Sequence, residues 1–125
     1  MKTLAQMIVL ILMSSTLYGQ DIKGQWNGVI NIQGSDYRIV FHISKTDKQY
    51  KATLDSPDQN ATGIPVTTVS LNNPNVKFEI SNIGMVYEGI LSDNSITGKW
   101  TQAGQAFPLV LLKTENLLDE NNKKK

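Results

Sequence analysis

Few residues in this chain of 125 could carry out acid–base or metal chemistry. His42 is the single histidine, and there is no cysteine. A structural zinc site takes about four histidine, cysteine or carboxylate ligands, so one histidine alone argues against such a site. A serine–histidine system needs a nucleophile on a strained turn and an acid that orients the histidine, and the sequence shows neither. We therefore expect no catalytic residue, no metal and no cofactor.

Two carboxylates lie close together in residues 55–59, which read Asp-Ser-Pro-Asp-Gln. Neighbouring carboxylates can share acid–base work or bind calcium. Loop aspartates also accept hydrogen bonds from the backbone of a turn, and a proline between them favours that role. We expect turn chemistry here, and we predict that the loop residues Asp55, Ser56, Asp58 and Gln59 are candidates for contact with a partner. A small enzyme that acts through Asp55, Asp58 and His42 is the least favoured alternative.

The elements that must position these residues are predicted from alternation of apolar and polar side chains. Alternation with a period of two, interrupted by turn residues, is typical of half-buried antiparallel strands. His42 falls on the polar face of its strand. The residues on the expected inner faces are Trp26, Gly28, Ile30, Ile32, Tyr37, Ile39, Phe41, Ile43, Tyr50, Ala52, Leu54, Val76, Phe78, Ile80, Met85, Tyr87, Gly89, Leu91, Ile96, Gly98 and Trp100.

One predicted strand, residues 64–71, has an irregular pattern. Its apolar set shifts from Ile64 and Val66 to Val69 and Leu71. A β-bulge of one residue near Thr67 would produce such a shift, and we predict one there.

Short turns between strands favour sequential hairpins, and a meander of about eight strands can close on itself. We predict an all-β domain over residues 21–113. Its expected architecture is a small antiparallel up-and-down barrel of about eight strands, calycin-like, and either closed or partly open. A two-sheet β-sandwich is the alternative. Residues 114–125 form a polar C-terminal tail in this prediction.

The first 20 residues are predicted to be a signal peptide. Lys2 gives a positive start, an apolar run follows over residues 4–17, and the small Gly19 precedes the expected cleavage point. The apolar run is shorter than the ~20 residues of a membrane-spanning helix, although an uncleaved anchor is the alternative. We expect a secreted or periplasmic, soluble protein without a membrane span after cleavage.

The mature chain is expected to carry no net charge. The whole chain has 12 Lys and Arg residues and 11 Asp and Glu residues, and one of the basic residues, Lys2, belongs to the predicted signal peptide. A balanced charge gives no long-range attraction for nucleic acid, so we expect no nucleic-acid partner. The absence of cysteine excludes a disulfide framework.

Two Gly-x-Trp patterns, at residues 24–26 and 98–100, resemble the strand openings of lipocalin and avidin-type barrels. In those barrels the tryptophan plugs the barrel or lines its pocket, whereas core packing is the simpler interpretation. We expect Gly28 and Gly98 to make room for the two indole rings. The candidate ligand-binding residues, all aromatic and all expected to point inward, are Trp26, Phe41, Tyr50, Phe78, Tyr87, Trp100 and Phe107.

A wider resemblance covers residues 22–113. The segments that carry it are Val40–Ile43, Thr53–Gln59, Gly63–Val66, Tyr87–Gly89, Gly98–Gln102 and Phe107–Leu109. Together they resemble a small β-domain that precedes serine α/β-hydrolase domains in exported Bacteroidetes-type proteins. The chain has no Gly-x-Ser-x-Gly motif, so no catalytic residue can be transferred from such a hydrolase.

The sequence therefore predicts an exported, non-catalytic binding or accessory module. It would bind a small apolar or amphipathic ligand in the barrel, or a protein partner through its loops. The alternative implied by the resemblance is an accessory subunit, or a remnant, of an exported serine hydrolase.

Overall fold

The computed structural model describes residues 21–114, which form nine β-strands and two single turns of 3₁₀-helix. The predicted signal peptide and residues 115–125 of the predicted tail lie outside the described residues. The elements are β1 (Gly24–Ile32), β2 (Ser35–Thr46), β3 (Gln49–Ser56), η1 (Pro57–Gln59), β4 (Ala61–Pro65), β5 (Thr68–Asn72), β6 (Asn75–Ile80), η2 (Ser81–Ile83), β7 (Met85–Ser92), β8 (Ser95–Gln102) and β9 (Gln105–Lys113).

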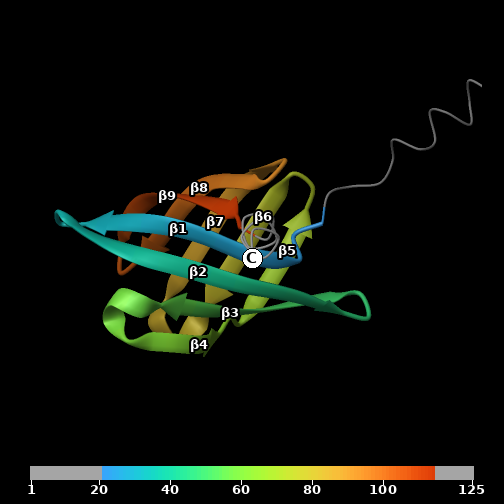
Figure 1. Ribbon diagram of the computed structural model, residues 1–125, viewed down its shortest axis with the longest axis horizontal. Helices are drawn as coiled ribbons and strands as arrows, with labels where there is room; N and C mark the ends of the chain where they lie inside the picture. Colours follow the sequence, from blue (N-terminus) through green and yellow to red (C-terminus); the bar gives the residue numbers. More distant parts are fainter. Residues whose placement is uncertain (1–20, 115–125) are drawn as a thin grey trace, which may run out of the picture.

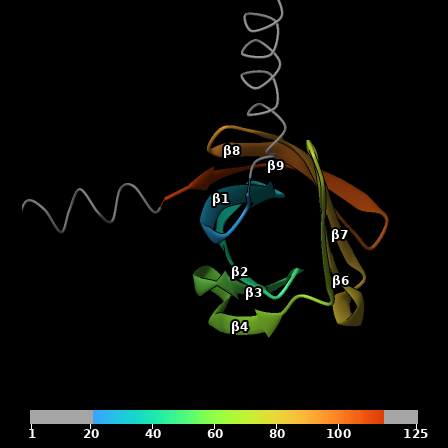
Figure 2. The same cartoon turned by 90° about the vertical axis from the view of Figure 1, so that its right-hand side faces the viewer.

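All nine strands, which are labelled in Figure 1, belong to one antiparallel sheet in the order β4-β3-β2-β1-β9-β8-β7-β6-β5. The sheet curls so that its strands lie around a ring, which Figure 2 shows nearly end-on. The structure thus confirms the predicted all-β up-and-down barrel in its partly open form, and the two-sheet sandwich is wrong. The pairing of β1 with β9 joins the first and last strands in the middle of the sheet, through Trp26–Lys113 and Asn27–Leu112.

The end strands of the sheet, β4 and β5, follow each other in the chain and are separated only by Val66 and Thr67. β4 pairs with β3, and β5 pairs with β6. The Val66 N–H donates to the Ala52 carbonyl at 3.0 Å, and the Thr67 N–H donates to the Glu79 carbonyl at 2.7 Å. These two residues therefore link the two ends of the sheet.

This link corrects the prediction of a one-residue bulge near Thr67, and it explains why the structure has nine strands where about eight were predicted. A bulge adds a residue to a strand that keeps one partner. Here the chain changes partner from β3 to β6. A bulge and a change of partner produce the same shift in the apolar pattern. Val66 and Val69 would point to opposite faces of an unbroken strand, yet both are partly buried against the core.

The predicted inner faces are confirmed, because every residue named for them is buried or partly buried.

Three rings meet at the centre of the barrel. The ring centroids of Phe41 and Phe78 lie 4.7 Å apart, and those of Phe78 and Tyr87 lie 5.8 Å apart. Trp26 is fully buried, and its Nε1–H donates to the Ile22 carbonyl at 2.9 Å. Side chains therefore fill the middle of the barrel.

The glycines near the tryptophans serve a different purpose from the one predicted. A methyl group at Gly28 would lie 2.8 Å from Cδ1 of Leu109, and one at Gly98 would lie 2.7 Å from Cα of Gly89 on β7. In both places the closest atoms belong to neighbouring strands and not to an indole ring. Gly28 makes room for leucines of β9, and Gly98 allows the backbones of β7 and β8 to approach closely. The expectation that they accommodate the rings was wrong.

Candidate functional site

His42 and Asp55 form a pair on the outer face of the sheet. Nε2 of His42, on β2, lies 2.8 Å from Oδ2 of Asp55, on β3. Oδ1 of the same carboxylate accepts a hydrogen bond of 2.7 Å from the Gly63 N–H, on β4. The Gly63 N–H and His42 both stabilise the charged carboxylate, and this lowers the pKa of Asp55. Asp55 thereby ties β2, β3 and β4 together.

Asp58 has a different partner. It accepts hydrogen bonds from the Arg38 backbone N–H at 2.7 Å and from the guanidinium Nη2 at 3.0 Å. The pKa of Asp58 is lowered because Arg38 bonds to its charged form. The structure therefore does not bring Asp55 and Asp58 to a common site. Neither carboxylate caps the 57–59 turn, so the turn capping predicted for them is wrong. Asp55 bonds to β2 and β4, and Asp58 holds the turn to Arg38 on β2.

The other two loop residues predicted to contact a partner bond to each other. The Ser56 hydroxyl donates to Oε1 of Gln59 at 3.2 Å, and Ser56 itself is buried. Ser56 is therefore a poor contact residue, whereas Asp58 and Gln59 lie at the surface.

The chemistry that this part of the surface could perform is limited. Within residues 21–114, no serine or threonine hydroxyl is hydrogen-bonded to His42. No group of three His, Asp or Glu side chains that could hold a metal ion occurs among the described residues. The His42–Asp55 pair has the base and the orienting acid of a hydrolytic site, but it lacks the positioned nucleophile that such a site requires.

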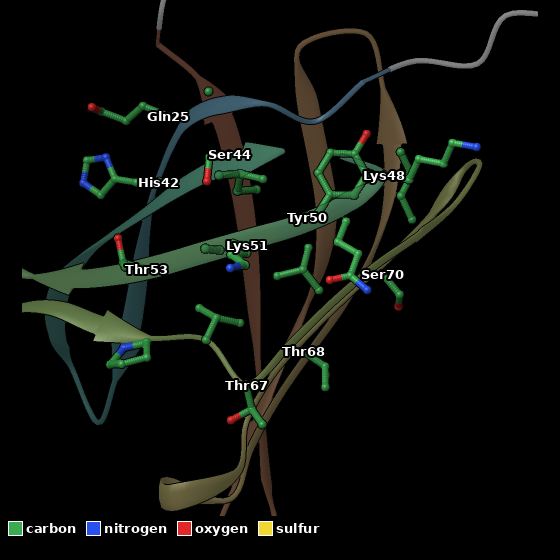
Figure 3. A pocket seen from close by; sticks show the side chains of 18 residues that line it. Gln25, His42, Ser44, Lys48, Tyr50, Lys51, Thr53, Thr67, Thr68 and Ser70 are labelled. Carbon is green, nitrogen blue, oxygen red and sulfur yellow. The ribbon is translucent and has the colours of Figure 1, made fainter. Parts of the chain in front are cut away.

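A cleft of about 1190 Å³ opens where the barrel is incomplete. It is lined on one side by residues 48–53 of β3 and the preceding turn, and on the other by residues 65–71 of β4, the link and β5. Gly24, Gln25 and residues 42–44 complete the lining. Figure 3 shows Tyr50 and Lys51 on β3, with Thr68 and Ser70 on the strand opposite. We call this hollow the seam cleft.

The floor of the seam cleft is apolar. Tyr50, Val66, Val69 and Leu71 are partly buried and pack against the hydrophobic core. Lys48 and Lys51 also line the cleft, and none of its described lining residues is an aspartate or glutamate. The chemistry of the cleft therefore suits a ligand with an apolar body and a negative group.

Tyr50 is held at the mouth of the cleft by two charged residues. Its hydroxyl donates to Oδ1 of Asp21 at 3.0 Å, and Nζ of Lys45 lies 5.0 Å from its ring centroid. Partial burial, followed by the hydrogen bond to Asp21, raises the pKa of Tyr50. The ring is thus fixed by contacts at both its edge and its face, as a preformed binding wall would be.

The seven predicted aromatic residues divide into two groups. Trp26, Phe41, Phe78, Tyr87 and Trp100 are buried in the core, and Phe107 is partly buried against it. Of the seven, only Tyr50 lines the seam cleft.

The cleft residues that the sequence analysis missed include Lys48, Lys51, Val69 and Leu71. The shift of the apolar pattern around Thr67 marks the position of Val69 and Leu71 but not that of the two lysines.

The fold and the cleft together define the class: a partly open, antiparallel up-and-down β-barrel with a packed interior and a cleft at its seam. Comparisons with protein-family models, with curated proteins and with solved structures found no match. Among the described residues, no helix has the length and apolar character needed to cross a membrane.

Proposed function

We propose that this protein is an exported, non-catalytic binding module that holds its ligand in the seam cleft and not in the barrel interior. The observation that carries the proposal is the cleft of about 1190 Å³ with an apolar floor, beside a barrel centre that is already filled by aromatic rings. Binding sites are usually concave, mostly apolar and furnished with a few polar groups, and the seam cleft has this character.

The ligand is amphipathic in this proposal. Its apolar part lies over Tyr50, Val69 and Leu71, and a negative group lies near Lys48 or Lys51. Docking on a separate exported hydrolase is the alternative drawn from the sequence resemblance. The non-catalytic role is supported by the position of His42, whose Nε2 contacts Asp55 on the sheet surface.

The test uses an anilinonaphthalene sulfonate dye, which is apolar and anionic and fluoresces more strongly in apolar surroundings. We expect saturable binding to the wild-type protein. Val69→Asp places a charge on the cleft floor and should weaken binding at least about ten-fold, a change of ~1.4 kcal/mol. Val29→Asp is the matched control, because Val29 is 54% exposed on β1 and does not line the cleft.

Circular dichroism and thermal melts establish that both variants are folded. Lys51→Glu provides a second test at an exposed residue, and it should weaken dye binding without altering the core. Equal affinities for the wild type and Val69→Asp, or a loss confined to Val29→Asp, would place the dye elsewhere and would refute the proposal.

A further inference from the structure

We infer that the ligand of the seam cleft is an extended polypeptide segment that adds to the sheet as a β-strand along the free edge of β5. This inference rests on the proposed function and names the class of ligand. The expected segment alternates apolar and acidic side chains. Three features of the described residues lead to it: two free strand edges, an alternating lining and unpaired lysines.

The first feature is the pair of free edges. β5 pairs with β6 on one side, and among the described residues no strand pairs with its other side. β3 pairs with β4 only from Thr53 to Ser56, so its residues 49–52 have β2 as their one strand partner in the part of the chain described. Both edges line the seam cleft.

Free strand edges favour a polypeptide ligand over a small molecule. Each edge presents backbone N–H and C=O groups at the spacing of a strand, about 3.3 Å per residue. A small molecule can satisfy one or two such groups, whereas an added strand supplies donors and acceptors along the whole edge. The bond from the Val66 N–H to the Ala52 carbonyl already joins the two sides at one end of the cleft. That end therefore acts as a fixed stop for an incoming strand.

The second feature is the alternation of the lining. On β5, Val69 and Leu71 are partly buried, whereas Ser70 between them is exposed. On β3, Tyr50 is partly buried and Lys51 is exposed. A strand added to β5 on the side that faces β3 would have one row of side chains over the apolar floor and the alternate row beside Ser70 and Lys51. This arrangement requires the same alternation in the ligand.

The third feature is the charge of the outer row. Lys48 and Lys51 line the cleft, and neither forms an ion pair with another described residue. Opposite charges on adjacent strands stabilise pairing, whereas like charges oppose it. An acidic outer row in the ligand complements these lysines. Asp21 is the acidic residue near the mouth, and it already has two other partners. Its Oδ1 accepts the hydrogen bond from the Tyr50 hydroxyl, and its Oδ2 lies 3.9 Å from Lys23 Nζ.

Lysines at strand edges also have a protective role, because they hinder association between exposed edges. That role predicts that no peptide binds and that removing the positive charge causes self-association. The experiment must therefore separate docking from protection.

The experiment selects peptides from a displayed library of random nine-residue sequences against the wild-type protein, with Val69→Asp for counter-selection. We expect enriched sequences that alternate apolar and acidic residues. A synthetic copy of one enriched peptide is then N-methylated at alternate residues, in two versions that together cover all of its amides. At least one version should bind at least about ten-fold more weakly, because N-methylation removes the edge hydrogen bonds and leaves the side chains in place.

The protein variants give a second readout with the same peptide. Lys51→Glu should weaken binding at least about ten-fold, whereas Lys99→Glu, at an exposed position on β8, should change it less than about two-fold. Analytical ultracentrifugation of Lys51→Ala and Lys99→Ala, which remove the charge without reversing it, measures self-association.

Each contrary result has a defined meaning. If no peptide is enriched while the dye still binds in the cleft, strand addition is wrong and the proposed function stands. If neither peptide nor dye binds, the proposed function fails as well. N-methylated peptides that bind as tightly as the parent overturn the inference, because side chains alone would then explain recognition. Self-association of Lys51→Ala without peptide binding to the wild type overturns it in favour of edge protection.

Discussion

Trp26 gives the most direct test of the packed barrel interior. The side chain is fully buried, and its Nε1–H donates to the Ile22 carbonyl. Truncation of a buried aromatic side chain to alanine costs about 3–5 kcal/mol. The Ile22 carbonyl would also lose its partner, and an unsatisfied buried group costs about 1–3 kcal/mol. We therefore expect Trp26→Ala to lower the free energy of unfolding by about 5 kcal/mol.

Urea unfolding followed by far-ultraviolet circular dichroism measures this loss. A domain of this size has a total stability of about 5–15 kcal/mol, so Trp26→Ala could be unfolded before urea is added. Trp26→Phe keeps most of the apolar volume and removes the hydrogen bond, and it should cost less than Trp26→Ala. This second variant keeps the difference measurable.

Trp100→Ala is the comparison within the same protein. Trp100 is 6% exposed, and its Nε1–H donates to the Gln102 side chain instead of a buried carbonyl. Its truncation should cost about 3 kcal/mol, the lower end of the range for buried aromatics. Losses below about 1 kcal/mol at both tryptophans would refute the packed interior, because surface substitutions have effects of that size.

Two further predictions concern the sheet and its surface. Gly98→Ala should lower the free energy of unfolding by at least about 1–3 kcal/mol, because the new methyl group would lie 2.7 Å from Cα of Gly89 on β7. Urea melts measure this loss, and Thr97→Ala, at the exposed neighbouring position, is the control. Equal losses for the two variants would contradict the close approach of β7 and β8. Asp55→Asn should make the free energy of unfolding fall less steeply as the pH is lowered. The pKa of Asp55 is lowered in the folded state, so the stability that its charged carboxylate contributes is complete above about pH 4 and is lost as the pH falls through the folded pKa. Urea melts between pH 7 and pH 2.5 compare it with the wild type, and parallel pH profiles would show that the Gly63 and His42 contacts do not favour the charged form.

The alternation of side chains was sufficient to predict the strands and their inner faces. In β2, for example, Ile39, Phe41 and Ile43 are buried while His42 faces outward, because successive side chains of a strand point to opposite sides. Turn residues supplied the hairpin connections, so the up-and-down order followed from local signals. These parts of the fold depend on neighbours that are close in the sequence.

The parts that could not be predicted depend on register between distant residues. His42 and Asp55 are 13 positions apart, and Arg38 and Asp58 are 20 apart, so each pair forms only when β2 and β3 are correctly aligned. The space beside Gly98 is likewise decided by Gly89, its cross-strand partner on β7. A single sequence contains no record of these alignments.

The bend at Val66–Thr67 connects the closure of the barrel with its candidate binding site. A closed barrel has no free strand edges, and this removes the risk of edge-to-edge association. Here the segment 61–72 pairs with β3 through its first half and with β6 through its second half. It links the two ends of the sheet, but it leaves part of β3 and one side of β5 without a strand partner among the described residues. The seam cleft is therefore a direct consequence of the way in which this barrel closes. A ligand that completes the pairing would gain backbone hydrogen bonds that residues 21–114 do not make at this bend.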